Sequence, residues 1–515
     1  MRQWPRPGPR VLVLGFLFVV AFCLRLYDIG LPPMEFHAFR QYHGALLARG
    51  FYEWLLVGKM TTVPEDGILE PPILEVIASF AYRILGGEYL WIPRLLSSVF
   101  WMGGGIFLYL IAKKITTANA AVFSLLFYLF VPFSVFASRA FMPDPLMVML
   151  LLVSVFTILQ YHEQPTRRRL LVASLASASA VFAKPGICFF QLLGAFVSLA
   201  VYRQGLRRSL TDLRLLTFTT LCVLPTGLYY LYGRFFAGFI YAEASERVTP
   251  RTLLEPSFWQ GWGEQVGVVV GYTALVGSLI GIMLLRKGLP RALMAGLWSG
   301  YILFGLTFAG HVSTHDYYSL QLIPVVALSL GPLAEFLLAT LKQAGDGNRL
   351  GRVIWGEIGR VATITLVVLA LFFSAVEHRT TIQQIMNQNR AASGYSREVA
   401  AYQKIGEEVN HSQRTIILVD KPHDSGYPLM YHGRILGRDW TSNDKPTGTT
   451  KIREGSRTQE HLNALSSKAS PEYFIISTKM WKSKTYEDLR NLLTENFPIA
   501  SQDNGYIVVD LRKKD

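Results

Sequence analysis

Long apolar runs separated by short polar connections constrain this chain more than any other feature. A helix needs about 20 mostly apolar residues to cross a bilayer core of about 30 Å. Only 17% of the 515 residues are charged, whereas about a quarter is usual in soluble proteins. We therefore expect a polytopic α-helical membrane protein with about eleven spans. These lie near 11–27, 90–112, 116–138, 144–161, 168–183, 186–202, 213–234, 265–285, 291–309, 318–341 and 354–376.

The distribution of basic residues predicts the orientation. With the N-terminus inside and an uncleaved first span, alternate connections carry most of the Lys and Arg, as the positive-inside rule requires. Of the short outer connections, one carries Arg139, one carries Lys184, and 311–317 carries no Lys or Arg. The net charge of +14 therefore does not indicate a nucleic-acid partner, because the basic residues are scattered through short connections. We expect the protein in a cell (inner, cytoplasmic) membrane. The cytoplasmic basic residues are Lys113, Lys114, Arg167, Arg168, Arg169, Arg203, Arg207, Arg208, Arg214, Arg286, Lys287, Arg291, Lys342, Arg349 and Arg352.

The segment 70–86 is apolar but contains Glu75 and Arg83, and a span there would invert every later connection. We interpret it as an amphipathic helix in the outer interface. Residues 28–89 then form one large outer loop with helices of its own, and 235–264 form a second. The predicted transmembrane domain covers 1–376.

Beyond residue 376 the chain becomes polar, and short β-rich runs appear at 415–419, 473–477 and 506–510. Helical stretches lie between them, near 393–409 and 484–496. This pattern predicts a C-terminal extracytoplasmic α/β domain over 377–515.

Polar residues crowd together where the first span ends, including Glu35, His37 and Arg40. A carboxylate at the entry to a helix can act as a general base, and an arginine can bind an anionic leaving group. The alternative is a capped helix start, in which an acidic residue in the first turn complements the helix dipole.

Three further sites show ionisable groups beside expected spans. Arg139 and Asp144 flank a tight turn, which is also a common helix start before proline. Ionisable groups near the lipid boundary are costly unless they are used. Lys184 either binds a ligand or extends to the interface as a snorkelling side chain. The segment 311–318 is either a site or a hydrated loop.

Cys23, Cys188 and Cys222 are expected to be small buried hydrophobes.

In order and topology, these clusters resemble the GT-C glycosyltransferases that use polyprenyl-phosphate sugars, including the protein O-mannosyltransferase-like and lipid A aminoarabinose transferase families. The resemblance covers residues 1 to about 340. The matching pieces are 35–41 with 45–49, 70–72, Arg94, 139–144, 184–186 and 315–318 running to Pro324.

The resemblance implies an outward-facing cavity where an acceptor displaces the lipid phosphate from a sugar with inversion. By position, Glu35 would be the base, and Asp144 would support the catalytic centre. Donor phosphate and sugar would contact His37, Arg40, Arg139, Lys184, His315, Tyr317 and Tyr318, with Asp28, Glu70 and Arg94 as secondary candidates.

The chain departs from the family in one respect that concerns the base. Many members show adjacent Asp and Glu in the first loop, whereas alignment on Ala48 and Arg49 places Arg40 and Gln41 there. The base therefore remains open between Glu35, Asp144 and Asp28. We favour Glu35.

The expected partners are a polyprenyl-phosphate sugar, membrane lipids and an acceptor that is a lipid, a glycan or a protein. The sequence requires no cofactor, and no residue pattern supports a divalent metal. A transporter or lipid flippase is the main competing class, but its polar residues would lie near the bilayer midplane, often in repeated halves. A polysaccharide ligase would place its key residues in one large late loop. A non-catalytic scaffold would use the C-terminal domain as its binding module.

Overall fold

The computed structural model describes the backbone of residues 8–64, 67–68, 70–238, 249–343, 350–420, 426–440, 458, 460–463, 465, 470–503 and 505–512. Part of the expected outer loop 235–264, residues 239–248, lies outside these ranges. The chain divides into two compact units. We call Met1–Ile29, Ile68–Leu74 and Pro93–Met386 the helical unit, and Gly30–Gly67, Glu75–Ile92 and Asn387–Asp515 the mixed unit. The domain boundary expected near residue 376 stays a prediction.

The helical unit contains a helix at every expected span. Two of these spans are broken: 116–138 becomes two helices at Val131, before Pro132, and 265–285 becomes two helices joined at Gly271 with a bend of 85°. The helices are α1 (Pro9–Leu26), α4 (Trp91–Ile115), α5 (Ala118–Phe130), α6 (Pro132–Ala137), α7 (Asp144–Glu163), α8 (Arg167–Ala183), α9 (Phe189–Gln204), α10 (Leu206–Leu210), α11 (Leu213–Phe235), η2 (Pro250–Leu254), α12 (Pro256–Val270), α13 (Tyr272–Leu284), α14 (Leu289–Thr307), α15 (Ala309–Val312), η3 (Asp316–Ser319), α16 (Leu322–Gln343), α17 (Leu350–Glu377) and α18 (Arg379–Met386).

Five helices among the described residues are long and apolar enough to cross a membrane, or up to seven if each bent pair forms one span. The five are α1, α4, α7, α11 and the Leu322–Leu341 part of α16. Several other expected spans are shorter helices, such as α8 with 17 residues and α9 with 16. The count of about eleven spans therefore stays a prediction.

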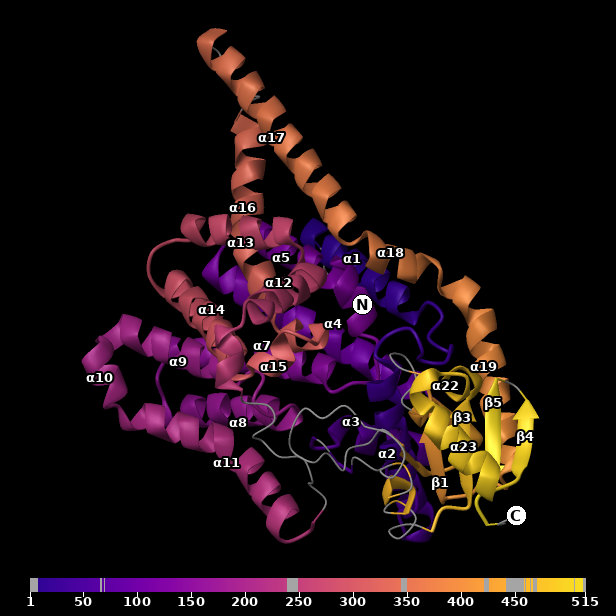
Figure 1. Cartoon of the computed structure of the whole chain (residues 1–515). Helices are drawn as coiled ribbons and strands as arrows, with labels where there is room; N and C mark the ends of the chain where they lie inside the picture. Colours follow the sequence, from indigo (N-terminus) through magenta and orange to yellow (C-terminus); the bar gives the residue numbers. More distant parts are fainter. Residues whose placement is uncertain are drawn as a thin grey trace, which may run out of the picture. The chain divides into compact units, whose positions relative to one another are not determined.

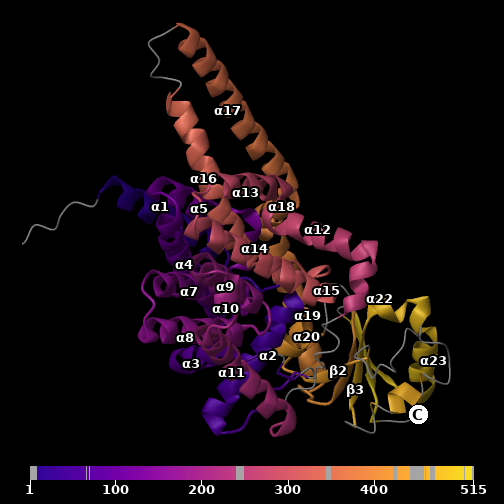
Figure 2. The same cartoon turned by 90° about the vertical axis from the view of Figure 1, so that its left-hand side faces the viewer.

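Small residues let the helices of this unit approach closely. Helix α8 lies between α7 and α11, and α9 packs on α14 (Figure 2). At the α9–α14 contact, a Cβ on Gly194 or Gly296 would collide with the backbone carbonyl of the other glycine. Close backbone approach through small residues is the usual way in which membrane helices pack.

The mixed unit contains a five-stranded sheet with helices on it (Figure 1). Its strand order is β2-β1-β3-β5-β4; β1 pairs in parallel with β2 and β3, and β5 pairs antiparallel with β3 and β4. The expected β-runs are strands β1, β3 and β5. The elements are α2 (Ala38–Val57), most of α3 (Ile73–Leu85), α19 (Gln388–Glu408), β1 (Thr415–Leu418), α20 (Tyr427–Gly433), β2 (Gly437–Asp439), β3 (Tyr473–Ser477), α22 (Thr478–Trp481), η4 (Lys484–Tyr486), α23 (Glu487–Asn496), β4 (Ile499–Asp503) and β5 (Tyr506–Asp510).

The two faces of the sheet meet different partners because successive strand residues point to opposite sides. Ile416 and Leu418 join a buried cluster that includes Leu489 and Leu493 of α23. Ile417 points to the other face, where a Cβ on Gly426, just before α20, would lie 3.1 Å from it. Helix α20 therefore starts against the face opposite α23.

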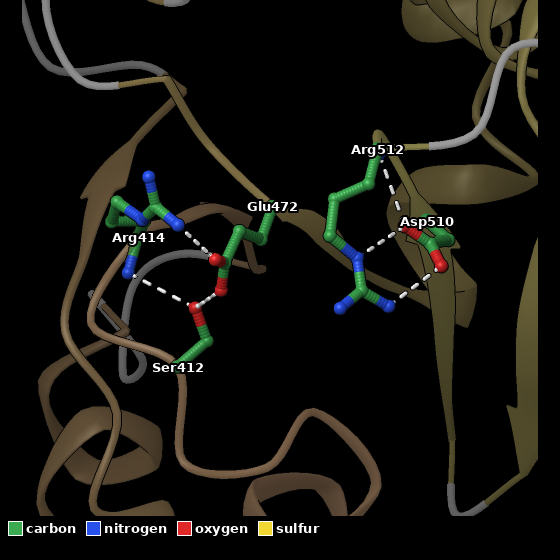
Figure 3. A network of polar contacts seen from close by, with 5 residues as sticks. All are labelled: Ser412, Arg414, Glu472, Asp510 and Arg512. Carbon is green, nitrogen blue, oxygen red and sulfur yellow. Dashed lines mark hydrogen bonds and ion pairs between the residues drawn. The ribbon is translucent and has the colours of Figure 1, made fainter.

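Polar contacts lie at one end of the three inner strands, where β1 and β3 begin and β5 ends (Figure 3). Glu472 accepts hydrogen bonds from Ser412, at 2.6 Å, and from Arg414. Arg512 donates to both carboxylate oxygens of Asp510, at 2.9 and 2.8 Å. The contacts of Glu472 tie the start of β3 to the start of β1, whereas the Arg512–Asp510 contacts are local to the end of β5.

Helix α3 occupies the segment in which we expected an amphipathic helix. It has 13 residues, and its length of about 20 Å is too short to cross a bilayer core. A helix here is therefore confirmed, while its position in the outer interface stays a prediction.

Candidate active site

The centre of the candidate site in the helical unit is a buried ion pair between two predicted residues. Lys184, the C-cap of α8, places its Nζ 2.5 Å from Oδ1 of Asp144, the first residue of α7. The side chains are 1% and 2% exposed. Buried charges persist where they are paired, because an unpaired one is very costly. Lys184 is therefore a fixed cation and not a snorkelling side chain.

Two tyrosines cover the same ammonium group. The Lys184 Nζ lies 4.6 Å from the ring centroid of Tyr317 and 5.1 Å from that of Tyr318, within the range of a cation–π interaction. Both tyrosines belong to η3, which turns the chain back before α16. The ring of His315 contacts them edge-on, with centroids 5.4 and 5.9 Å away. The structure thus brings five of the predicted residues together, including Asp144 and Lys184.

Arg94 and Arg139 bind the backbone at the end of α1. Arg139 donates to the carbonyls of Tyr27, at 2.7 Å, and Asp28, at 3.3 Å, and Arg94 donates to that of Ile29 at 2.9 Å. Both arginines are nearly fully buried. These contacts position the segment that leaves the first span, and a role of either arginine in phosphate binding stays a prediction.

Asp28 itself has two unusual features. Its φ of 53° lies in the left-handed region, which costs about 1–3 kcal/mol for a residue other than glycine. Its Oδ2 is buried and, within the described part of the chain, accepts no hydrogen bond. Buried polar atoms of this kind are uncommon in folded proteins. Both features keep Asp28 among the candidate bases.

Sequence reasoning missed Arg25, which lies inside the expected first span near 11–27. Arg25 is fully buried and donates to the Ser138 hydroxyl at 2.6 Å and to the Leu129 carbonyl at 3.0 Å. The available signal was a cation inside an apolar run, where ionisable residues are rare.

Glu35, His37 and Arg40 belong to the mixed unit and lie at the start of α2. We considered a helix beginning near Glu35, but α2 begins at Ala38, because His37 adopts a left-handed conformation with φ 41°. The Gln41 side chain donates back to the Phe36 carbonyl at 2.5 Å, which stabilises this turn. Glu35 therefore precedes the helix and does not lie in its first turn.

Tyr395 of α19 is a second residue that the sequence did not indicate. Burial raises the pKa of Tyr395, and the carboxylates of Glu35 and Glu398 raise it further. This interaction places the Tyr395 hydroxyl in the electrostatic environment of Glu35.

The remaining predicted residue, Glu70, lies half-buried just before α3. Among the described residues, no group of three or more His, Cys, Asp or Glu side chains is arranged to hold a metal ion. The site as described consists of carboxylates, cations and aromatic rings.

Comparisons with known proteins concern both the sequence and the fold of this chain. Residues 69–229 match the family model described as dolichyl-phosphate-mannose-protein mannosyltransferase. No curated protein matches the sequence. The fold is similar to that of ArnT from Cupriavidus metallidurans bound to undecaprenyl phosphate, with 16% identity, a TM-score of 0.58 and 98% of each chain covered. The apo state of the same protein gives 15% identity and a TM-score of 0.59, covering 97% of this chain and 98% of that one.

A second protein has a similar fold. The oligosaccharyltransferase of Archaeoglobus fulgidus, in a complex with Zn and sulfate, shares 11% identity with a TM-score of 0.52, covering 93% of this chain and 71% of that one. At these identities the likeness concerns the fold. The resemblance seen in the sequence is therefore confirmed: this chain has the fold of the GT-C glycosyltransferases, and its residues 69–229 match the dolichyl-phosphate-mannose-protein mannosyltransferase family.

Proposed function

We propose that this protein is a multi-pass membrane glycosyltransferase that moves a sugar from a polyprenyl-phosphate donor to an acceptor on the outer face of a cell membrane. The similarity to a transferase crystallised with undecaprenyl phosphate supports this class of donor. The acceptor is a lipid, a glycan or a protein.

The buried Asp144–Lys184 pair beneath Tyr317 and Tyr318 is the observation that carries the proposal. The pair fixes one ammonium group between a carboxylate and two aromatic faces. A positive charge held in place before the reaction stabilises the negative charge that develops on a leaving phosphate. Lys184 is therefore assigned to the donor phosphate, and Asp144 supports the centre by holding Lys184.

The chemistry is a single displacement. The acceptor oxygen forms a bond to the anomeric carbon while the bond from that carbon to the phosphate oxygen breaks. The electron pair leaves with the polyprenyl phosphate, and a carboxylate takes the acceptor proton. Inversion at the anomeric carbon follows because attack and departure occur on opposite faces.

Glu35 is our first candidate for that carboxylate. It lies before α2 and close in sequence to Arg40, a second candidate cation for the phosphate. Asp28 is the alternative, because its Oδ2 is buried without a hydrogen bond in the described part of the chain. Asp144 is engaged with Lys184 at 2.5 Å, which favours positioning over proton transfer.

The test is transfer by purified full-length protein in lipid, supplied with a panel of polyprenyl-phosphate sugars. We expect the wild type to release polyprenyl phosphate and a glycosylated product. Glu35→Gln should bind donor but transfer nothing, while Asp28→Asn retains turnover. Turnover by Glu35→Gln together with loss in Asp28→Asn would move the base to Asp28. Transport of lipid or solute without donor consumption would overturn the proposed function.

A further inference from the structure

Helix α2 is joined along one face to a helix that lies almost 400 residues later in the chain. Phe39, Tyr42 and Arg49 recur at spacings that place them on a single face of α2. Phe39 stacks on Tyr427 of α20, with ring centroids 5.1 Å apart. Tyr42 contacts Tyr431, with ring centroids 5.6 Å apart. Both helices belong to the mixed unit, so this contact is internal to one compact body.

The specific polar contact in this interface joins Tyr42 and His432. The Tyr42 hydroxyl lies 2.7 Å from Nε2 of His432, and Tyr42 is fully buried. The His432 ring also stacks on Tyr402 of α19, with centroids 6.4 Å apart. A buried hydroxyl and a partly buried imidazole that bond to each other fix both side chains, because breaking the pair would remove this hydrogen bond from both.

An ion pair fixes the same face of α2 about two helical turns after Tyr42. Arg49 donates to the Glu88 carboxylate at 2.7 Å, with side chains 9% and 15% exposed. The guanidinium carbon also lies 4.1 Å from the ring centroid of Tyr431. Helix α2 therefore has two polar anchors on one side, about seven residues apart, and this arrangement resists both rotation and sliding of the helix.

The first anchor lies close to the candidate catalytic residues in the sequence. Arg40 is two residues before Tyr42, and Glu35 is seven residues before it. Glu35 lies two residues before the left-handed His37, which is the N-cap of α2. A small rotation of α2 would therefore move both Glu35 and Arg40. Misplacement of a reacting group by about 1 Å can reduce a rate by about 100-fold.

We propose that Tyr42 and His432 form a positioning pair, through which the C-terminal segment 387–515 holds α2 in the orientation that sugar transfer requires. The inference rests on the proposed function, because it assigns the pair to the placement of Glu35 and Arg40. Neither residue is assigned a contact with the reacting atoms. The C-terminal segment is thereby part of the catalytic apparatus and not a separate binding module.

The test is a double-mutant cycle with Tyr42→Phe and His432→Gln in the full-length protein. We expect each single variant to lower kcat about tenfold while KM for the donor changes less than twofold. The double variant should be no slower than the slower single variant, because both changes break one interaction. Tyr52→Phe is the matched control. It removes a hydroxyl from the same helix at a residue whose ring contacts Tyr82 at 6.1 Å, and it should retain the wild-type kcat.

Hydrogen exchange of the 38–43 amides provides a readout that does not depend on turnover. Tyr42→Phe should accelerate this exchange at least tenfold relative to Tyr52→Phe. Wild-type kcat and exchange in both single variants would overturn the pairing. A double variant slowed by the product of the two single effects would overturn it as well. If the wild type consumes no donor, the proposed function fails, and faster exchange would still establish that the pair positions α2.

Discussion

Asp144 and Lys184 lie 40 positions apart in the sequence and meet at 2.5 Å with both side chains almost fully buried. Asp144 starts one helix and Lys184 ends the next, so the pair also links the ends of α7 and α8. The contact therefore has a structural effect and a chemical effect, and mutations can separate them.

Removing one member of this pair should destabilise the protein by about 3–5 kcal/mol, because a buried charge is left without its partner. We expect this for Lys184→Met and for Asp144→Asn. The double variant should recover most of the lost stability yet remain inactive, because the cation is absent. Thermal unfolding in detergent and the transfer assay measure both effects.

The control for this prediction is the exposed pair Lys114–Glu163, whose side chains are 31% and 41% exposed at 2.7 Å. Lys114→Met should cost less than about 1 kcal/mol. Equal losses of stability in Lys184→Met and Lys114→Met would contradict the structural part of the assignment.

Gly271→Ala should destabilise the helical unit by at least about 1–2 kcal/mol. Gly271 joins α12 to α13 at φ 79°, and a Cβ there would lie 2.6 Å from Oε2 of Glu377. The Glu377 carboxylate accepts hydrogen bonds from the Thr273 amide and hydroxyl at the start of α13, so the collision would also disturb this cap.

Gly227→Ala in α11 is the matched control for Gly271→Ala. A Cβ at Gly227 meets nothing within 4 Å, and alanine is favoured over glycine inside a helix by about 1 kcal/mol. Unfolding temperatures of the two variants should therefore change in opposite directions. A stabilising effect of Gly271→Ala would show that the bend does not require glycine.

The mixed unit should lose stability as the pH falls from about 6.5 to about 4. Burial lowers the pKa of His432 to about 4, and the positive charge of Arg49 lowers it further. The unfolded chain has the ordinary higher pKa, binds the proton first, and is therefore favoured on acidification. The full effect is about 3 kcal/mol, at about 1.4 kcal/mol for each pKa unit.

Denaturation of the wild type and of His432→Phe at several pH values tests this dependence. The groups around His432 are Tyr42, Tyr402, Tyr431 and the more distant Arg49. His432→Phe should flatten the curve between pH 6.5 and 4. An unchanged slope in His432→Phe would assign the dependence to other groups.

Arg139→Met should destabilise the helical unit by about 1–3 kcal/mol, because two partly buried carbonyls lose their donor. The carbonyls are those of Tyr27 and Asp28. Arg169→Met removes a donor to the Gln160 carbonyl at a less buried position and should cost less. Unfolding of the two variants in the same detergent gives the comparison, and a smaller loss for Arg139→Met would exclude its positioning role.

Sequence patterns predicted the helices well, because apolar runs require burial in a bilayer or a core. They did not predict where those helices break. The window 265–285 is apolar on both sides of Gly271, so hydropathy alone treats an 85° bend as one continuous span. The α5–α6 break at Val131 is likewise hidden, although Pro132 was a visible signal.

Part of the candidate site was also predictable from the sequence. Asp144, Lys184 and Tyr317 were recognisable because polar side chains are conspicuous between apolar spans. The Tyr42–His432 contact was not, because a tyrosine within a polar cluster and a histidine in a distant segment carry no shared pattern. The pairing depends on long-range packing, which one sequence does not reveal.

The distance in sequence between Tyr42 and His432 has a consequence for biosynthesis. The two residues are 390 positions apart, and a ribosome that adds about 5–20 residues per second reaches the second roughly 20–80 s after the first. During that interval helix α2 lacks the partner that buries its aromatic face. The first segment of a nascent chain is therefore exposed to proteases until the last quarter of the chain is made. Chains that terminate early keep the tyrosines of α2 exposed, and we expect them to be degraded.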